Sequence, residues 1–285
     1  MPPESCHLYI GDDDLLQPLR SIAQHRRARF SDQVKALVSG IFFLICIICT
    51  NLSLAIIHDY IPQSPPLPDL VYSLILANQY TLVTGEICMF IAGITSLVVL
   101  LAHPERWKLI ARLEFLAGLL YLGRALTMGV TLLPLPSVSQ ECAPQLSGTS
   151  LMVVGRRLLD SLAGLGTESA GLRSACGDLI YSGHTIICVL SYLFTKEYAP
   201  KKVQSQLRGL IFVLSGIAML CFIVSRLHYT IDVVLAYYFA SRLFYAYHSA
   251  LDNVASYGSY SGNLHRGDAI SDLFWYPMLR FLEDT

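Results

Sequence analysis

One uncharged run constrains this chain more than any other feature of its sequence. Ala36–Ile57 covers 22 residues and holds no Asp, Glu, Lys or Arg. About 20 such residues are enough for a helix to cross the hydrocarbon core of a bilayer. The arm before the run is long and has no small-residue cleavage pattern, so the run is not a signal peptide. We therefore expect a transmembrane helix here.

Five more apolar segments predict further membrane-spanning helices. Of the 285 residues, 54% are hydrophobic and 14% are charged, whereas soluble domains are ~25% charged. The formal net charge of -1 provides no basic field for nucleic acid. A soluble enzyme and a nucleic-acid-binding protein are therefore excluded, and we expect an all-α membrane protein with six transmembrane helices. The five further segments are Gln79–Leu101, Leu109–Leu133, Leu179–Thr195, Leu207–Ser225 and Tyr229–Ala250.

The positive charges outside these segments predict an orientation. The N-terminal arm is rich in arginine, and the loops after the second and fourth segments also carry Lys or Arg, whereas the loop 58–78 carries none. Positive charges gather on the cytosolic side of membrane proteins. Both termini should therefore face the cytosol, and the loops 58–78, 134–178 and 225–228 should face the lumen or the exterior.

The outer loops have recognisable compositions. Pro62–Pro68 should be extended and stiff because of its prolines, and Leu151–Leu162 has the pattern of an amphipathic helix. Cys142 and Cys176 share one outer loop, on the side where disulfides persist, and the sequence leaves open whether they are bridged. In the tail, Ser256–Asn263 is low in complexity and is expected to be disordered.

Two charged side chains fall inside the expected spans, where charge is costly and marks a functional site by default. Glu86 should lie about 10 Å, and Arg124 about 14 Å, from the outer ends of their helices, at 1.5 Å of rise per residue. The similar depths allow a buried ion pair between Glu86 and Arg124. They equally allow both groups to line a polar substrate cavity.

Three titratable groups stand near the outer ends of the last three expected helices. His228 and Asp232 are four residues apart and so share one helical face. A carboxylate one turn from an imidazole fixes its tautomer and stabilises its cation. His184, about five residues into the fourth expected helix, lies at a similar depth. Two imidazoles and a carboxylate support phosphoryl transfer through a phosphohistidine, in which one imidazole attacks phosphorus and the other protonates the departing alkoxide.

Arg226, two residues before His228, has two interpretations. It either holds the anionic oxygens of a phosphate group or is an arginine at the membrane edge whose charge reaches water. No Cys and His spacing is typical of a zinc site, and no cluster of Asp and Glu suggests another metal. We therefore expect neither a metal nor a cofactor.

The motifs around these residues resemble a known family. Ser182-Gly-His184 followed by a later His-x3-Asp looks like the lipid phosphate phosphatase superfamily. More narrowly, CGDLIYSGHT at 176–185 and HYTIDVVLAY at 228–237 resemble the sphingomyelin synthase family, as does PPLPD at 65–69. The resemblance implies a six-helix transferase without a cofactor. It would move a phospho-headgroup from a glycerophospholipid donor to a ceramide acceptor on the luminal or outer leaflet.

The resemblance also implies roles for individual residues. His228 would be the nucleophile, Asp232 its orienting carboxylate, and His184 the acid and base. Asp178 and Glu86 match acidic positions of the family and would be supporting carboxylates. Arg124 and Arg226 complete the set of residues expected to support the site or bind substrate.

Two differences from the patterns of related enzymes bear on which phosphate substrate and which headgroup the protein uses. Its phosphatases carry a Lys-x6-Arg-Pro motif, and this chain has no Arg-Pro, which favours transfer from a phosphodiester. Leu227 stands where the choline- and ethanolamine-transferring members usually have an acidic residue. We expect phosphocholine transfer from phosphatidylcholine, giving sphingomyelin and diacylglycerol. Phosphoethanolamine, phosphoinositol and water as the acceptor stay open as alternatives, as does a non-catalytic lipid transporter or scramblase.

The expected organisation has three parts: a cytosolic arm over residues 1–35, a six-helix membrane catalytic domain over 36–250 and a cytosolic tail over 251–285. The arm is too short for the SAM domain that some related enzymes carry. We expect residence in the Golgi or plasma membrane, with cytosolic termini and a luminal or extracellular site. The sequence leaves a homodimer open.

Overall fold

The computed structural model describes residues 30–137, 142–146, 150–164, 175–258 and 273–283. Over these residues the chain is helical and contains no strand. Each of the six segments expected to span a membrane contains one long helix. The elements are α2 (Asp32–Ile57), η1 (His58–Tyr60), α3 (Leu70–Leu74), α4 (Thr81–Ala102), α5 (Arg106–Val130), α6 (Leu151–Ala163), α7 (Gly183–Tyr198), α8 (Gln204–Val224), α9 (Thr230–Gly258) and α10 (Tyr276–Glu283).

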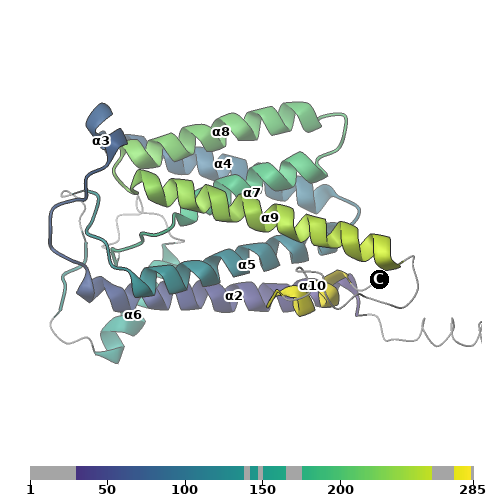
Figure 1. Ribbon diagram of the computed structural model, residues 1–285, viewed down its shortest axis with the longest axis horizontal. Coiled ribbons are helices and arrows are strands. Elements are labelled where there is room, and N and C mark those ends of the chain that lie inside the picture. The colour runs from purple at the N-terminus through teal and green to yellow at the C-terminus, as the bar shows by residue number, and fades with distance from the viewer. Residues whose placement is uncertain (1–29, 138–141, 147–149, 165–174, 259–272, 284–285) are drawn as a thin grey trace, which may run out of the picture.

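The six long helices run side by side along the longest axis of the molecule (Figure 1). Helix α2 packs along α5, and α4 packs on α8. Helix α7 lies in the middle, in contact with α4, α5, α8 and α9. The connections that hold α3 and α6 gather at one end of the bundle, and α10 lies at the other end (Figure 1). Connections from distant parts of the sequence therefore meet at the α3 end.

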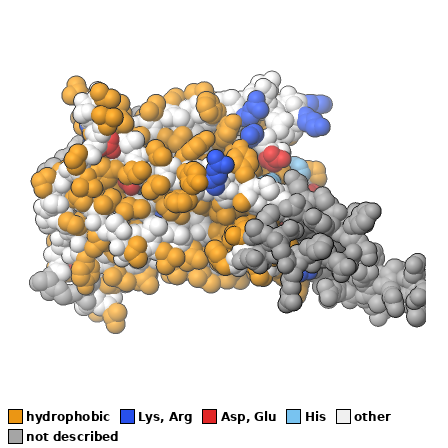
Figure 2. Space-filling model, viewed as in Figure 1, with side chains coloured by type: hydrophobic (Ala, Val, Ile, Leu, Met, Phe, Trp, Pro, Cys, Tyr) orange, Lys and Arg blue, Asp and Glu red, His pale blue; other side chains and the backbone are white. Residues whose placement is uncertain are grey.

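Three helices are long and apolar enough to cross a membrane on their own. Within the described residues these are Asp32–Tyr60, Thr81–Ala102 and Gln204–Val224. Their outward side chains are large and apolar, for example Leu44, Ile94 and Phe212, and hydrophobic side chains spread over the flank of the bundle (Figure 2). Helix α7, with 16 residues, is enclosed by its neighbours. The number of spans stays a prediction.

Helix α7 begins later than expected. The sequence predicts its start at Leu179, whereas the helix starts at Gly183. The side chain of Ser182 accepts a hydrogen bond from the N–H of Thr185 at 3.2 Å, which is the usual contact of an N-terminal cap. His184 consequently lies in the first turn of α7 rather than five residues into it. The last long helix differs in the opposite sense, because α9 continues to Gly258, beyond the expected end at Ala250.

The loop 134–178 contains the expected amphipathic helix. Helix α6, Leu151–Ala163, matches the expected Leu151–Leu162. Arg157 fixes this helix to the end of α2, because its guanidinium donates hydrogen bonds to both carboxylate oxygens of Asp59 at 2.9 and 2.8 Å. The proline-rich stretch 62–68 has no regular secondary structure, as its composition predicts.

The C-terminal segment is part of the bundle. Trp275, Leu279 and Leu282 are buried in the main hydrophobic core, and their spacing of four and three residues places them on one helical face. The Arg112 guanidinium donates two hydrogen bonds of 2.7 Å to the carboxylate of Glu283. The apolar face and this ion pair dock α10 onto the bundle. The sequence places this segment in the expected cytosolic tail and predicts no contact for it. Residues 259–263 of the stretch expected to be disordered lie outside the described residues.

Truncating the docked face of α10 should destabilise the whole bundle. The side chain of Leu279 is 0% exposed, so Leu279→Ala should lower the free energy of unfolding by ~2–5 kcal/mol through lost burial and the cavity left behind. Phe274→Ala, at a side chain that is 79% exposed, is the matched control. Thermal unfolding of the purified protein in detergent measures both, and equal unfolding temperatures would contradict the docked arrangement.

Candidate active site

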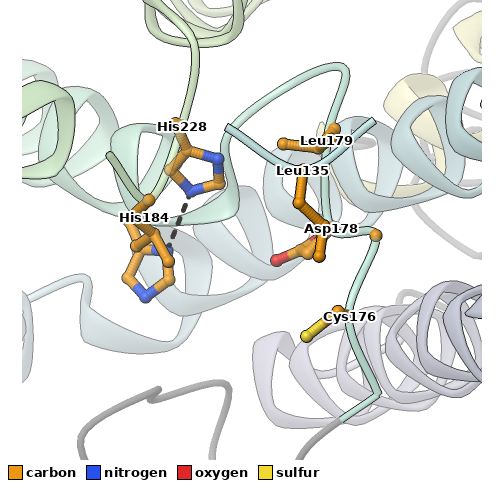
Figure 3. A pocket seen from close by; sticks show the side chains of 8 residues that line it. Leu135, Cys176, Asp178, Leu179, His184 and His228 are labelled. Carbon is orange, nitrogen blue, oxygen red and sulfur yellow. Dashed lines mark hydrogen bonds between the residues drawn. The ribbon is translucent and has the colours of Figure 1, made fainter. Parts of the chain in front are cut away.

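Two connecting segments bring His184 and His228 together at the α3 end of the bundle. His228 lies in the turn between α8 and α9, and its backbone N–H and that of Leu227 both donate to the carbonyl of Phe222. His184 follows the irregular segment 175–182. The two imidazoles meet with Nε2 of His228 at 3.4 Å from Nδ1 of His184 (Figure 3). Residues 44 positions apart in the sequence thus form one site.

Gly177 gives the segment before α7 its course. Its φ is +107°, a conformation that residues with a Cβ rarely adopt. A Cβ at this position would also lie 2.6 Å from Cδ1 of Ile61. Glycine is therefore required by both backbone conformation and space, and it lets the chain turn past η1 toward the pocket.

Asp232 supports the nucleophile candidate from the first turn of α9. Its carboxylate is fully buried and accepts hydrogen bonds from the backbone N–H of Ile180 at 3.1 Å and of Tyr229 at 3.0 Å. Its Oδ2 lies 3.9 Å from Nδ1 of His228. That separation is longer than a hydrogen bond, and catalytic contacts in substrate-free sites often tighten only in the complex. A proton on Nδ1, facing the carboxylate, leaves the lone pair of Nε2 toward His184 and the pocket.

A small pocket lies in front of the two histidines. Leu135, Asp178 and Leu179 face the two imidazoles across it (Figure 3). No Lys or Arg is among its lining residues. The lining residues are Leu135, Cys176, Gly177, Asp178, Leu179, His184, Leu227 and His228.

The ion pair that the structure gives Arg124 is to Asp178. The sequence allowed an ion pair between Arg124 and Glu86, because the two residues were expected at similar depths in their helices. That expectation took no account of the segment 175–182, which folds back toward the bundle and brings Asp178 to Arg124. The Nε–H of Arg124 also donates to the carbonyl of Tyr181 at 2.8 Å, and its Nη1 would lie 3.0 Å from a Cβ on Gly183. Arg124 therefore brings a buried, compensated positive charge to the start of α7.

Glu86 and Arg226 lie around this pocket rather than in its lining. Glu86 is buried on α4, next to Gly85, whose Cβ position is 3.0 Å from the ring of Phe222. The ring of Phe222 in turn packs on that of His184, with centroids 4.9 Å apart. The guanidinium of Arg226 lies over the ring of Tyr72, 3.6 Å from its centroid. The structure therefore joins His184, His228, Asp232, Asp178 and Arg124, whereas Glu86 and Arg226 do not line the pocket.

A disulfide and a buried histidine secure the loop that carries Asp178. Cys142 and Cys176 are bridged, which resolves the alternative that the sequence left open. His58, at the end of α2, accepts a hydrogen bond from the N–H of Cys176 on Nδ1 at 2.9 Å, and its Nε2 lies 2.9 Å from the carbonyl of Ala143. The sequence interpretation missed His58, because its partners lie 85 and 118 residues away.

The site lacks the arrangement of a metal centre over the part of the chain that the structure describes. No three His, Cys, Asp or Glu side chains converge on one point there. The imidazoles of His228 and His184 and the carboxylate of Asp232 are side chains from which a nucleophile with an acid and base can be built. Helix α7 adds the partial positive charge of its N-terminus beside His184.

The fold and the site together define a class of protein, a helical membrane protein with a His–His–Asp site between neighbouring helices. The model of a protein family described as PAP2 superfamily C-terminal matches residues 175–249. This range includes His184, His228 and Asp232. Several curated proteins named phosphatidylcholine:ceramide cholinephosphotransferase are similar to the chain over most of its length. The one numbered 1 from Caenorhabditis elegans is 33% identical over 253 residues, covering 88% of this chain and 52% of that protein.

Two vertebrate proteins of the same name are similar to the chain to the same degree. Phosphatidylcholine:ceramide cholinephosphotransferase 1 from Gallus gallus is 34% identical, covering 87% of this chain and 59% of the relative. Phosphatidylcholine:ceramide cholinephosphotransferase 2 from Rattus norvegicus is also 34% identical, covering 86% of this chain and 66% of the relative. The chain belongs to the sphingomyelin synthase family, as its motifs suggested. It spans 52% to 66% of the length of these three relatives.

The disulfide should contribute measurably to stability. Replacing Cys142 and Cys176 together by Ser frees the loop before Asp178, and loss of a native disulfide lowers the free energy of unfolding by ~2–5 kcal/mol. Cys49→Ser, at an exposed free cysteine, is the control. Thermal unfolding in detergent under non-reducing conditions measures the difference, and a double variant that unfolds like the control would count against this prediction.

His228 should remain neutral in mildly acidic solution. Burial, and then the neighbouring His184 and Arg124, lower the pKa of His228 well below its ordinary value of 6.5. The unfolded chain therefore takes up the proton first, and stability should fall as pH drops below about 6.5. In NMR spectra of histidine-labelled protein, the His228 Cε1–H signal, assigned by its absence in His228→Gln, should not titrate between pH 8 and pH 6.5. A titration midpoint near pH 6.5 would contradict the lowered pKa of His228.

Proposed function

We propose that this protein transfers phosphocholine from phosphatidylcholine to ceramide, giving sphingomyelin and diacylglycerol. The observation that carries the proposal is the contact between His228 and His184, 3.4 Å apart, with Asp232 beneath His228. The names of the relatives, phosphatidylcholine:ceramide cholinephosphotransferase, support the choice of both substrates. The chain would therefore be a transferase of substituted phosphate groups.

The proposed reaction has two balanced half-reactions. Nε2 of His228 attacks the phosphorus of phosphatidylcholine, and the bond from phosphorus to the diacylglycerol oxygen breaks. His184 gives a proton to that oxygen, so diacylglycerol leaves and phosphocholine stays on His228. The primary hydroxyl of ceramide then passes its proton to His184 and attacks phosphorus, and the bond from nitrogen to phosphorus breaks. Sphingomyelin leaves, and both imidazoles return to their starting states.

Supporting residues have narrower proposed roles. Asp232 holds the proton on Nδ1 of His228 and stabilises the cation that forms during attack. Arg124, paired with Asp178, stabilises the start of α7. Glu86 stabilises the packing of α4 on the ring of Phe222, which in turn packs on His184. The N–H groups in the first turn of α7 can bind the phosphate oxygens.

The apolar wall of the pocket favours choline over the alternative headgroups. Leu135, Leu179 and Leu227 line the pocket with Asp178. A trimethylammonium group has no N–H to satisfy and packs against such a wall. An ethanolamine ammonium has three N–H groups, of which the Asp178 carboxylate could accept some, and the hydroxyls of inositol would lie against the same leucines. Donors left without acceptors there would be costly. Phosphoethanolamine and phosphoinositol transfer, and hydrolysis by water, are the outcomes to be tested against phosphocholine transfer.

The membrane arrangement is likewise a proposal. We infer that α2, α4, α5, α7, α8 and α9 form six spans of one catalytic domain over residues 36–250, with the arm 1–35 and the tail 251–285 in the cytosol. The α3 end, with the site, then faces the lumen or the exterior of the Golgi or plasma membrane. The α10 end of the bundle carries Lys108, in the first turn of α5, and Lys201 and Lys202, in the turn before α8, which supports this orientation. Whether the protein forms a homodimer is also a question for experiment.

Replacing the nucleophile should abolish transfer. Purified protein in detergent would be given fluorescent ceramide with phosphatidylcholine, phosphatidylethanolamine or phosphatidylinositol, and the products identified by mass. We expect His228→Ala to lose all detectable transfer, and His184→Ala to lose about 10²–10⁴-fold, since general acid–base catalysis contributes that much. His103→Gln, at the opposite end of the bundle, should transfer normally.

The same assay separates the alternatives. Sphingomyelin formed from phosphatidylcholine supports the proposal, and a product from another donor would identify that headgroup instead. Diacylglycerol release without a phosphosphingolipid would mean hydrolysis. Transfer that survives in His228→Ala would refute the nucleophile assignment, and lipid movement without any transfer would indicate a transporter or scramblase.

A further inference from the structure

A short segment outside the bundle holds the turn that carries His228. This segment, Leu67–Ile75, includes α3, and we call it the clasp. None of its residues lines the pocket of Figure 3. It instead contacts the turn 226–230 through residues 151 to 162 positions away in the sequence.

Asp69 fixes the point where the turn enters α9. Its Oδ2 accepts a hydrogen bond from the N–H of Thr230 at 2.8 Å, and its Oδ1 accepts one from the Thr230 hydroxyl at 3.0 Å. The same carboxylate caps α3 by accepting from the N–H of Val71 at 2.9 Å. Thr230 is the first residue of α9, where a carboxylate is favoured by the unpaired N–H groups and the helix dipole. One side chain thus ties the clasp to the start of α9.

Tyr72 reaches the backbone of His228 directly. Its hydroxyl donates to the carbonyl of His228 at 2.7 Å, and its ring stacks on Tyr229 with centroids 5.8 Å apart. The guanidinium of Arg226 covers the same ring and donates to the carbonyls of Tyr72 and Ile75, each at 2.8 Å. Arg226 has a left-handed φ of 60°, which is unfavourable for arginine, so these contacts hold it in a costly conformation.

The contacts of the clasp surround the residue proposed as the nucleophile. Arg226 lies two positions before His228, Tyr72 bonds to the carbonyl of His228 itself, and Asp69 holds Thr230 two positions after it. A displacement of about 1 Å at a reacting group can cost about 10²-fold in rate. The imidazole of His228 moves with this backbone, so the clasp controls the distance from Nε2 to phosphorus.

We propose that Asp69, Tyr72 and Arg226 are positioning residues for the reaction, acting through the backbone of His228. The inference rests on the proposed role of His228 as nucleophile. It assigns Arg226 to contacts with the clasp, in place of the two roles that the sequence suggested, binding of the phosphate oxygens and anchoring at the membrane edge. None of the three side chains lines the pocket.

The test compares two tyrosines of one connection. Tyr72→Phe removes the hydroxyl that bonds to His228 and keeps the ring, whereas Tyr80→Phe changes a side chain that is 89% exposed. We expect Tyr72→Phe to lower kcat about 10-fold, with KM for phosphatidylcholine within twofold of wild type and an unchanged unfolding temperature. Tyr80→Phe should match wild type. Asp69→Ala should lower kcat further, and Asp69→Asn, whose amide oxygen still accepts from Thr230, should restore most of the loss.

A lipid-free readout separates this inference from the proposed function. Orthovanadate can adopt the five-coordinate geometry of phosphoryl transfer on a neutral imidazole, and such analogues of a transition state bind tightly only where the groups are correctly placed. Added vanadate should raise the unfolding temperature of wild type and Tyr80→Phe, and not that of His228→Ala. In Tyr72→Phe, the vanadate concentration that gives the same rise in unfolding temperature should be about 10-fold higher than in wild type.

Each outcome decides one of the two proposals. If wild type transfers nothing between lipids but the vanadate pattern holds, the proposed function fails and the clasp stands. If Tyr72→Phe and Asp69→Ala match Tyr80→Phe in kcat and vanadate response, the clasp is refuted. A lower kcat with an unchanged vanadate response would also refute it, because the effect would then not arise at His228.

Discussion

The site depends on the buried carboxylate of Asp232. It accepts hydrogen bonds from Ile180, in the segment before α7, and from Tyr229, in the turn before α9, while the N–H of Ser182 donates to its backbone carbonyl. A buried carboxylate without partners costs several kcal/mol, so both segments must be in place for this residue to be stable where it lies. Two loops far apart in the sequence therefore close together, and this closure brings His184 against His228.

Arginine–carboxylate pairs at both ends of the bundle follow a common arrangement. Arg124, on α5, pairs with Asp178 from the segment before α7, and Arg112, also on α5, pairs with Glu283 from α10. Arg124 is buried, and removing the partner of a buried charge costs ~3–5 kcal/mol, whereas the pair of Arg112 and Glu283 is partly exposed. Each pair thus joins an apolar helix, which could slide against its neighbours, to a segment that follows a different connection. The α3 end and the α10 end are fixed in register by the same kind of interaction.

The sequence predicts those parts of the structure whose signals are local. Hydropathy locates the six long helices, and the spacing of His228 and Asp232 places them on one turn before any coordinates are known. The partner of Arg124 could not be found this way, because a depth along a helix does not show which loop folds back beside it. The start of α7 was misplaced because the apolar run continues through residues that the Ser182 cap excludes from the helix. Contacts such as Tyr72 with His228, or His58 with Cys176, join single polar atoms across more than a hundred residues and leave no periodic signal.

The charge balance of the pocket bears on the kind of phosphate that it can bind. Arg124 is compensated by Asp178, Arg226 is held by the clasp, and none of the residues lining the pocket is Lys or Arg. A phosphomonoester with two negative charges would find no Lys or Arg among the lining residues, and the proposed mechanism supplies one positive charge there, on His184 when it acts as the acid. A phosphocholine diester has one negative charge on its phosphate, which His184 and the partial positive charge at the N-terminus of α7 can balance. The proposed transferase activity thus follows as much from the cations that the pocket lacks as from the histidines that it holds.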